Sequence, residues 1–91
     1  MMETAVEAAL KKKAEARGGK CYKLTSVRGI PDRIILLPVG KFAFVETKTD
    51  NGRISKIQMV TQKRLRDMGF LVFVVWKTCE IESVLDEIQT T

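Results

Sequence analysis

Two apolar runs separated by a short break dominate the middle of the chain. Residues 34–37 read Ile-Ile-Leu-Leu, residues 42–45 read Phe-Ala-Phe-Val, and the break between them contains Gly40. Apolar, β-branched and aromatic runs joined by a short glycine-containing turn are typical of a β-hairpin. Asp32 precedes the first run and residues 46–48, Glu-Thr-Lys, follow the second. The charged side chains therefore lie at the open end of the predicted hairpin.

The register of this hairpin decides which charged side chains share a face. Glu46 and Lys48 point to the same side because side chains alternate along a strand. A turn that pairs Leu37 with Lys41 places Asp32 opposite Glu46, and two facing carboxylates persist only with a cation between them or a proton on one. Mg²⁺ is a suitable cation, since it binds one or two carboxylates. A two-residue turn instead faces Asp32 away and leaves Glu46 and Lys48 as a solvated edge pair. The pattern alone leaves both registers open.

Three segments have the spacing of amphipathic helices. Residues 3–17 are rich in Ala, Glu and Lys and end at a Gly-Gly pair, and residues 79–88 follow Thr78 as a candidate cap. Residues 55–68 open with the Ser-x-x-Gln pattern of a capping box, which by itself explains Gln58. The side chains expected to face inward are Val6, Leu10 and Ala14 in the first helix, Ile57, Thr61, Leu65 and Met68 in the second, and Ile81, Val84, Leu85 and Ile88 in the third.

Two further segments read as strands. Residues 20–25 contain Cys21, Tyr22 and Leu24, and residues 70–76 are apolar at every position, which predicts an inner strand buried on both faces. The order is then α-β-β-β-α-β-α. We predict an α/β fold with a mixed four-stranded sheet flanked by helices, in which the hairpin is antiparallel and the last strand is reached through a helical crossover.

Length and composition limit the class of protein. Ninety-one residues with 45% hydrophobic content build one domain, so residues 1–91 are expected to form a single unit. The seven apolar residues 70–76 fall well short of the roughly 20 that cross a bilayer. The start of the chain, with Glu3 and Glu7, does not resemble a signal peptide. A soluble protein without membrane association is expected.

The net charge and the absence of histidine limit the ligands and the catalytic groups to be expected. Residues 79–91 carry four acids and no base, so residues 1–78 carry a net charge of +9 against +5 overall. A basic body of this kind suits nucleic acid, although surface lysines also serve solubility. Without histidine, acid-base chemistry must come from carboxylates, lysines, Tyr22 or metal-bound water. Cys21 and Cys79 form no metal or redox motif and read as small buried hydrophobes in a reducing compartment.

The residues around the hairpin resemble a known nuclease motif. Residues 28–33, Arg-Gly-Ile-Pro-Asp-Arg, are followed by Glu-Thr-Lys at 46–48 on an apolar strand, and this pair resembles the PD-(D/E)xK nuclease superfamily. Within it, the chain is similar to the virus-type replication-repair nuclease domain, VRR-NUC. The likeness extends to the first helix ending in Gly-Gly, to residues 54–58 and to Gly69-Phe70, so it covers nearly the whole chain.

This resemblance implies a restriction-endonuclease-like core and a metal-dependent phosphodiesterase acting on DNA. Matched residue by residue, Asp32 and Glu46 would bind Mg²⁺, with Mn²⁺ as a possible substitute, Thr47 would add its main-chain carbonyl, and Lys48 would be the catalytic lysine. A glutamate of the first helix would complete the site. Glu3 matches that place best and Glu7 competes with it, while Gln58 matches a glutamine beside the site.

The resemblance also suggests the biological setting. Stand-alone members of this size look like phage-encoded homodimers that act on branched DNA such as four-way junctions, which would place the protein in the cytoplasm of a bacterial host. The basic residues of the second helix, with Arg28, Arg33 and Arg53, would hold flanking phosphates, and the acidic last helix would complement basic helices across a dimer interface. Two other classes fit the same residues: a non-catalytic nucleic-acid-binding module, and a structural adaptor whose buried strand pairs with a partner.

Overall fold

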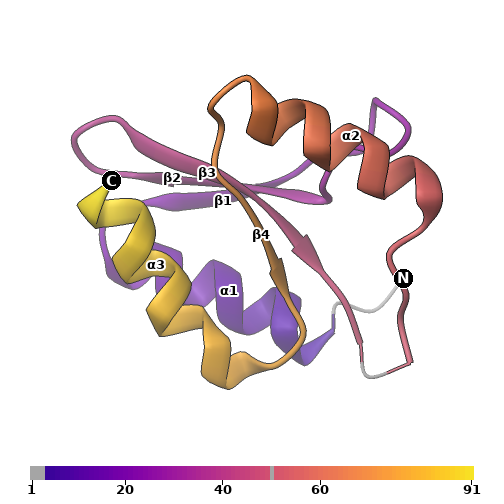
Figure 1. The fold of residues 1–91 in the computed structure, drawn as a ribbon. Coiled ribbons are helices and arrows are strands. Elements are labelled where there is room, and N and C mark those ends of the chain that lie inside the picture. The colour runs from indigo at the N-terminus through magenta and orange to yellow at the C-terminus, as the bar shows by residue number, and fades with distance from the viewer. Residues whose placement is uncertain (1–3, 50) are drawn as a thin grey trace.

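The predicted order of elements is confirmed. The computed structural model describes residues 4–49 and 51–91, and Figure 1 shows helices on both sides of one sheet. The elements are α1 (Ala5–Ala16), β1 (Lys20–Lys23), β2 (Arg33–Leu37), β3 (Lys41–Thr47), α2 (Lys56–Asp67), β4 (Val72–Val75), a 3₁₀ turn η1 (Thr78–Glu80) and α3 (Ile81–Thr90).

The four strands form one mixed sheet in the order β1-β2-β3-β4. β1, β2 and β3 pair antiparallel, and β4 runs parallel to β3 after the crossover through α2. Leu37 pairs with Lys41, so the β2–β3 turn has three residues, and the register is the one that faces Asp32 toward Glu46. Val39 in this turn has a positive φ of 67° although it is β-branched, a conformation that such residues rarely adopt.

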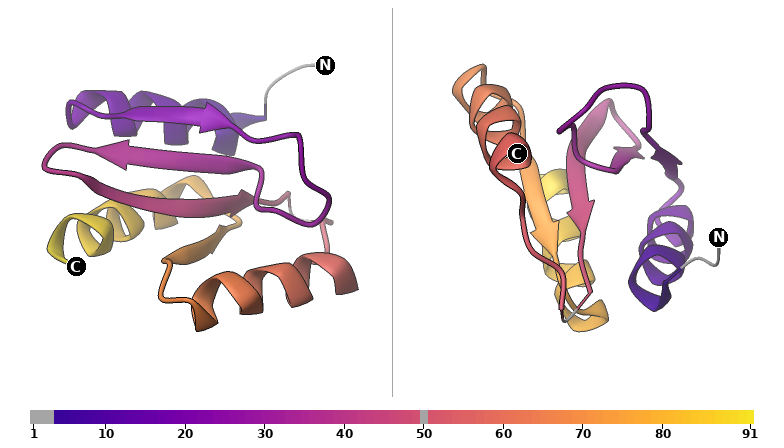
Figure 2. Two further views of the ribbon diagram at one scale, coloured as in Figure 1. Left: turned by 90° about the horizontal axis from the view of Figure 1, so that it is seen from above. Right: turned by 90° about the vertical axis from the view of Figure 1, so that its right-hand side faces the viewer.

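The core lies between the sheet and the pair α1 and α3. It contains Leu10 and Ala14 from α1, the alternate residues of β2 and β3, Val75 from β4, and Ile81, Leu85 and Ile88 from α3, most of them fully buried. Figure 1 shows α1 and α3 below the sheet and α2 above it, and Figure 2 shows α2 running beside β4. Among the described elements, no helix covers the upper face over β1 and β2.

The prediction that the apolar strand is an inner strand is wrong. Among the described strands, β4 pairs with β3 alone and lies at the edge of the sheet. Its apolar pattern has another cause: Val75 and Phe73 pack on the core with α3, while Val72 on the opposite face lies on the side of α2. Cover on both faces, and not a central place in the sheet, accounts for the uninterrupted apolar run.

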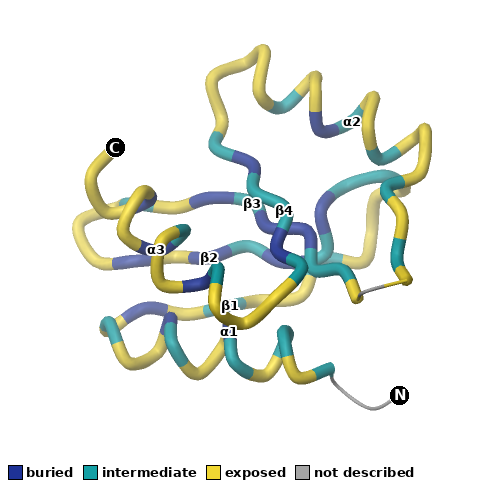
Figure 3. Tube along the Cα trace, turned by 60° about the horizontal axis from the view of Figure 1, so that its bottom comes forward, coloured by how far each residue is buried: buried dark blue, intermediate teal, exposed yellow. Residues whose placement is uncertain are grey.

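The inward face of α2 is displaced by about one residue from the predicted one. Ile57 is 41% exposed and Met68 is 66% exposed, whereas Gln62 is 2% exposed, and Figure 3 shows most of α2 as exposed. The covered side instead follows Gln58, Thr61, Gln62 and Leu65. Two glutamines lie on the side that faces the sheet, and a search for apolar periodicity does not detect polar residues on a covered side.

The remaining predictions for the outer elements are mostly confirmed. The inward residues of α1 and α3 are buried or partly buried in the core. Thr78 does not cap α3; instead the Glu80 carboxylate accepts hydrogen bonds from the backbone N–H groups of Trp76 and Lys77. Cys79 is exposed, so it is not the buried hydrophobe we expected, and Cys21 is partly buried. Within the described ranges, no helix has the length and apolar character needed to traverse a membrane.

Candidate active site

Asp32 stands at the end of the hairpin, one residue before β2. Pro31 before it is buried and fixes the entry of the chain into the strand. The pairing of Arg33 with Val45, continued by one step, brings Asp32 opposite Glu46. Both carboxylate oxygens of Asp32 accept hydrogen bonds from Thr47: the backbone N–H donates to Oδ1 over 2.7 Å and the hydroxyl donates to Oδ2 over 2.5 Å. The Asp32 carboxylate is thereby anchored to β3.

Glu46 is the buried acid of the site, with only 3% of its surface exposed. Its Oε2 lies 3.2 Å from the Lys48 ammonium and accepts a hydrogen bond of 3.1 Å from the Gln58 side-chain amide. Its Oε1 is buried and has no hydrogen-bond partner among the described residues. Burial, followed by the negative charge of Asp32, raises the pKa of Glu46, and the Lys48 ammonium opposes that rise. A buried acceptor oxygen without a donor is a place where a cation fits.

Gln58 joins α2 to the two charged groups of β3. Its backbone N–H donates to the Ser55 hydroxyl, and its side-chain oxygen accepts from the Ser55 backbone N–H, so the predicted capping box is present. The same Oε1 accepts a hydrogen bond of 3.0 Å from the Lys48 ammonium, while Nε2 donates to Glu46. The capping role and the site role are therefore compatible, and the fixed start of α2 holds Lys48 against Glu46.

Of the two glutamates that compete for the place in the first helix, the structure describes only Glu7. Glu3 lies outside the described residues. Glu7 Oε2 lies 2.8 Å from the guanidinium of Arg33, which is 6% exposed and also donates to the Asp32 backbone carbonyl. The structure thus gives Glu7 a structural ion pair beneath the sheet, behind Asp32. Arg33 was expected to hold a phosphate, and this is wrong, because its buried guanidinium is already occupied by Glu7.

Two carboxylates and one backbone carbonyl are the candidate donors for a metal ion. No cluster of three or more His, Cys, Asp or Glu side chains suited to a metal ion occurs within residues 4–49 and 51–91. Asp32 and Oε1 of Glu46, which has no hydrogen-bond partner among the described residues, would supply hard oxygen ligands, and these fit Mg²⁺ because this ion keeps several of its waters. The carbonyl of Thr47 belongs to the residue between Glu46 and Lys48 and remains the predicted third donor.

Exposed bases surround the start of α2. Arg28, Arg53 and Lys56 are exposed in the loops before Asp32 and at the helix start, and Arg64 is exposed further along α2. Lys63 is paired with Asp67 at 2.7 Å, and Arg66 donates to the Val72 carbonyl, so these two are already engaged. The bases left for phosphates lie on the side of the sheet on which Glu46 and Lys48 are held by Gln58.

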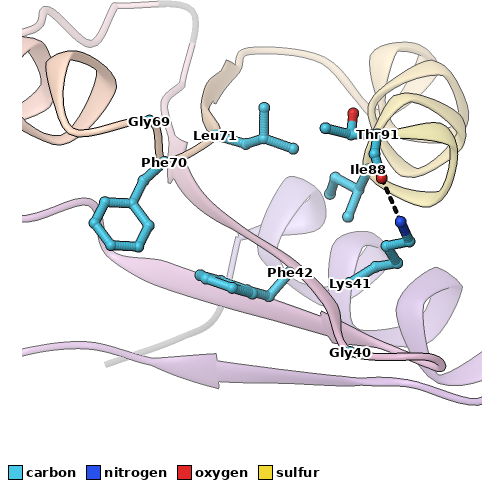
Figure 4. Close-up of a pocket in the computed structure, with 8 residues that line it drawn as sticks. All are labelled: Gly40, Lys41, Phe42, Gly69, Phe70, Leu71, Ile88 and Thr91. Atoms are coloured by element: carbon cyan, nitrogen blue, oxygen red, sulfur yellow. Dashed lines mark hydrogen bonds between the residues drawn. The ribbon is translucent and has the colours of Figure 1, made fainter.

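A groove at the other end of the hairpin is remote from these residues. Figure 4 shows it between the β2–β3 turn, the start of β4 and the end of α3, with Phe42, Phe70 and Ile88 in its wall, and its volume is about 260 Å³. Lys41 donates there to the carbonyl of Thr91. The groove lies at the closed end of the hairpin, whereas Asp32 and Glu46 lie at the open end, so it is not the candidate active site.

Comparisons with known proteins agree on one family. The model of the VRR-NUC domain matches residues 2–76. "Putative nuclease p44" of Acyrthosiphon pisum secondary endosymbiont phage 1 is 36% identical over 75 residues, which cover 80% of this chain and 81% of that protein. A solved structure described as a VRR_NUC domain superposes with a TM-score of 0.81 at 32% identity, over 89% of this chain and 90% of that one. With the predicted order of elements present in the fold, the chain belongs to the family of virus-type replication-repair nuclease (VRR-NUC) domains.

Proposed function

We propose that this chain is a Mg²⁺-dependent endodeoxyribonuclease that hydrolyses phosphodiester bonds in branched DNA. The observation that carries the proposal is the buried Glu46. One of its oxygens is paired with Lys48, the other has no donor among the described residues, and Asp32 lies opposite it. A bound Mg²⁺ would supply an activated water and relieve charge on the phosphoryl oxygens. Mn²⁺, with similar ligand preferences, should substitute.

The chain's own residues have distinct tasks in this proposal. Asp32 and Glu46, with the Thr47 carbonyl, would hold the cation. The Lys48 ammonium, 3.2 Å from a Glu46 oxygen, would orient the attacking water and stabilise charge on the phosphoryl group in the transition state. Gln58 keeps that ammonium in place through its side-chain oxygen.

A cleavage assay tests this function. Duplex, flap and four-way junction DNA are incubated with the protein in Mg²⁺, in Mn²⁺ and in a chelator. Asp32→Asn should abolish cleavage and retain DNA binding, and Asp67→Asn, which removes an exposed acid from α2, serves as the matched control. Cleavage in the chelator, or an active Asp32→Asn variant, would refute the metal site. Tight binding with no cleavage of any of these DNAs would favour the non-catalytic binding module.

We further propose that the active form is a homodimer, because one site cuts one strand and paired cuts at a junction need two sites in a fixed relation. The predicted interface through the acidic last helix loses its basis, since Glu82 and Asp86 pair with Arg17, and Glu82 also with Lys13, within the same chain. A phage protein among the relatives supports action in the cytoplasm of a bacterial host.

An apolar surface offers a better basis for self-association. Tyr22, Leu36, Phe42 and Phe70 are 38–53% exposed and lie above β1, β2 and β3, where none of the described helices covers the sheet. We call these four residues the open sheet face. Exposed aromatic and aliphatic clusters of this kind mark protein interfaces.

Light scattering at micromolar concentration gives the mass of the particle. Leu36→Lys should shift it toward a monomer, and Lys56→Met, on the exposed start of α2, should leave it unchanged. A monomeric wild-type chain that cuts junctions at full rate would leave a nicking enzyme in place of the paired-cut model.

A further inference from the structure

The hydroxyl of Thr47 has no assigned task, yet it makes one of the two shortest contacts in the site. It donates to Asp32 Oδ2 over 2.5 Å, and the backbone N–H of the same residue donates to Oδ1 over 2.7 Å. The Asp32 carboxylate is therefore held at both oxygens by a single residue of the neighbouring strand. Charge-assisted hydrogen bonds of this length are about twice as strong as neutral ones.

Thr47 occupies a position where strand alternation favours an apolar side chain. Along β3, the side chains of Ala43 and Val45 belong to the core, and Thr47 is the next residue on that face. It is opposite Val75 of β4, which is fully buried. Valine has nearly the same shape as threonine and a similar preference for strands. The hydroxyl in this position therefore has one visible function in the described structure, which is its bond to Asp32.

The two hydrogen bonds from Thr47 restrict the Asp32 carboxylate more than one bond would. The terminal torsion of an aspartate side chain is broad, so a carboxylate held only through Oδ1 can rotate about its Cβ–Cγ bond. The second bond, at Oδ2, fixes the plane of the carboxylate. Each carboxylate oxygen has two acceptor sites, so with Thr47 occupying one on each oxygen, the other remains available for a cation beside Glu46.

We propose that the Thr47 hydroxyl is a positioning group that orients the Asp32 carboxylate for a divalent cation. This rests on the metal-dependent function proposed above and adds a side-chain role to Thr47, whose backbone carbonyl alone was assigned to the metal. Groups that orient metal ligands typically contribute 10- to 100-fold to metal affinity or activity. The Thr47 hydroxyl thus helps to set the metal concentration at which the site is filled.

Thr47→Val and Thr47→Ser separate the hydroxyl from the rest of the residue. Thr47→Val keeps the backbone N–H, the carbonyl and the shape, and removes only the donor to Oδ2. It should raise the Mn²⁺ dissociation constant of the DNA-free protein, measured by calorimetry, by about 10- to 100-fold. The Mg²⁺ concentration for half-maximal cleavage should rise in parallel. Thr47→Ser should restore both values, and Thr49→Val, at an exposed position two residues further on, should change neither.

The outcomes distinguish this proposal from the function on which it rests. A folded Thr47→Val variant that binds Mn²⁺ as wild type does, or more tightly, would overturn the positioning role; tighter binding would mean that the hydroxyl competes with the cation. Failure of Thr47→Ser to rescue would do the same. Wild-type protein that binds no Mn²⁺ and cleaves in a chelator would remove the metal site itself and the proposal with it. If the melting temperature of Thr47→Val falls sharply, Thr47→Ala provides the same comparison.

Discussion

Replacing Lys48 by methionine removes an ammonium from the centre of the site and leaves the aliphatic stem. In the folded protein this ammonium is bound to Glu46 at 3.2 Å and to Gln58 at 3.0 Å, and 14% of the side chain is exposed. Removing one group that stabilises transition-state charge typically costs about 10²- to 10³-fold in rate, or about 3–4 kcal/mol. We therefore expect cleavage at saturating metal to fall by about that factor.

The effect on DNA binding should be far smaller. A protein that makes six to ten phosphate contacts loses about 10³- to 10⁵-fold in affinity between low and moderate salt, so each contact accounts for roughly threefold of that salt effect, and removing one contact changes the affinity by a small factor. Because Lys48 is paired with Glu46, even that share is an upper limit. The matched control is Lys56→Met, which removes an exposed base at the start of α2 and should weaken binding without changing the rate at saturating DNA.

Single-turnover cleavage gives the rate constant of each variant, and a binding titration gives its dissociation constant for DNA, both at saturating Mg²⁺. The variant leaves Glu46 with the Gln58 amide as its partner, at a cost of about 1–3 kcal/mol, so the melting temperature is measured in parallel. Losses of binding and of cleavage by the same factor would refute the reasoning and make Lys48 a phosphate contact.

Three further expectations follow from local geometry. Burial raises the pKa of Glu46, so the folded protein binds the proton of this carboxyl group more tightly than the unfolded chain does. The stability of the metal-free protein should therefore fall as the pH rises from the ordinary glutamate range through the raised pKa. Glu46→Gln should make the melting temperature less dependent on pH in melts from about pH 4 to 8. Gly29→Ala should lower stability by about 1–3 kcal/mol, because φ is +87° and the new Cβ would stand 2.6 Å from the Thr61 hydroxyl, whereas Gly69→Ala, with φ of +95° and open space, should cost less by denaturant titration. Val39→Asn should raise the melting temperature by about 4–8 °C, since Val39 is 91% exposed with φ of 67°, and an unchanged or lower value would contradict backbone strain there.

The placement of α2 shows where sequence patterns mislead. Ile57 and Met68 carry the apolar period, yet both are exposed, and the side that meets the sheet holds Gln58 and Gln62. Polar residues on a covered face carry no periodic signal of their own. For Gln58 the reason lies in tertiary contacts, because its side chain hydrogen-bonds to Glu46 and Lys48 of another element.

The sequence by itself determined the order of elements, the hairpin and the set of charged residues at its open end. These follow from local rules: apolar runs of strand length, a capping box, and glycines that end helices. The family motif added the expected roles of Asp32, Glu46, Thr47 and Lys48, all within one short stretch of chain.

Only the tertiary structure decided the register, the partners of the buried charges and the place of β4. A three-residue turn and a two-residue turn differ by one position, which pattern alone does not resolve, yet that position determines whether Asp32 meets Glu46. Likewise, Arg33 is a basic residue in the motif, but burial against Glu7 makes it structural. Contacts between residues far apart in sequence depend on how elements pack in three dimensions, and for this reason they have no local signature.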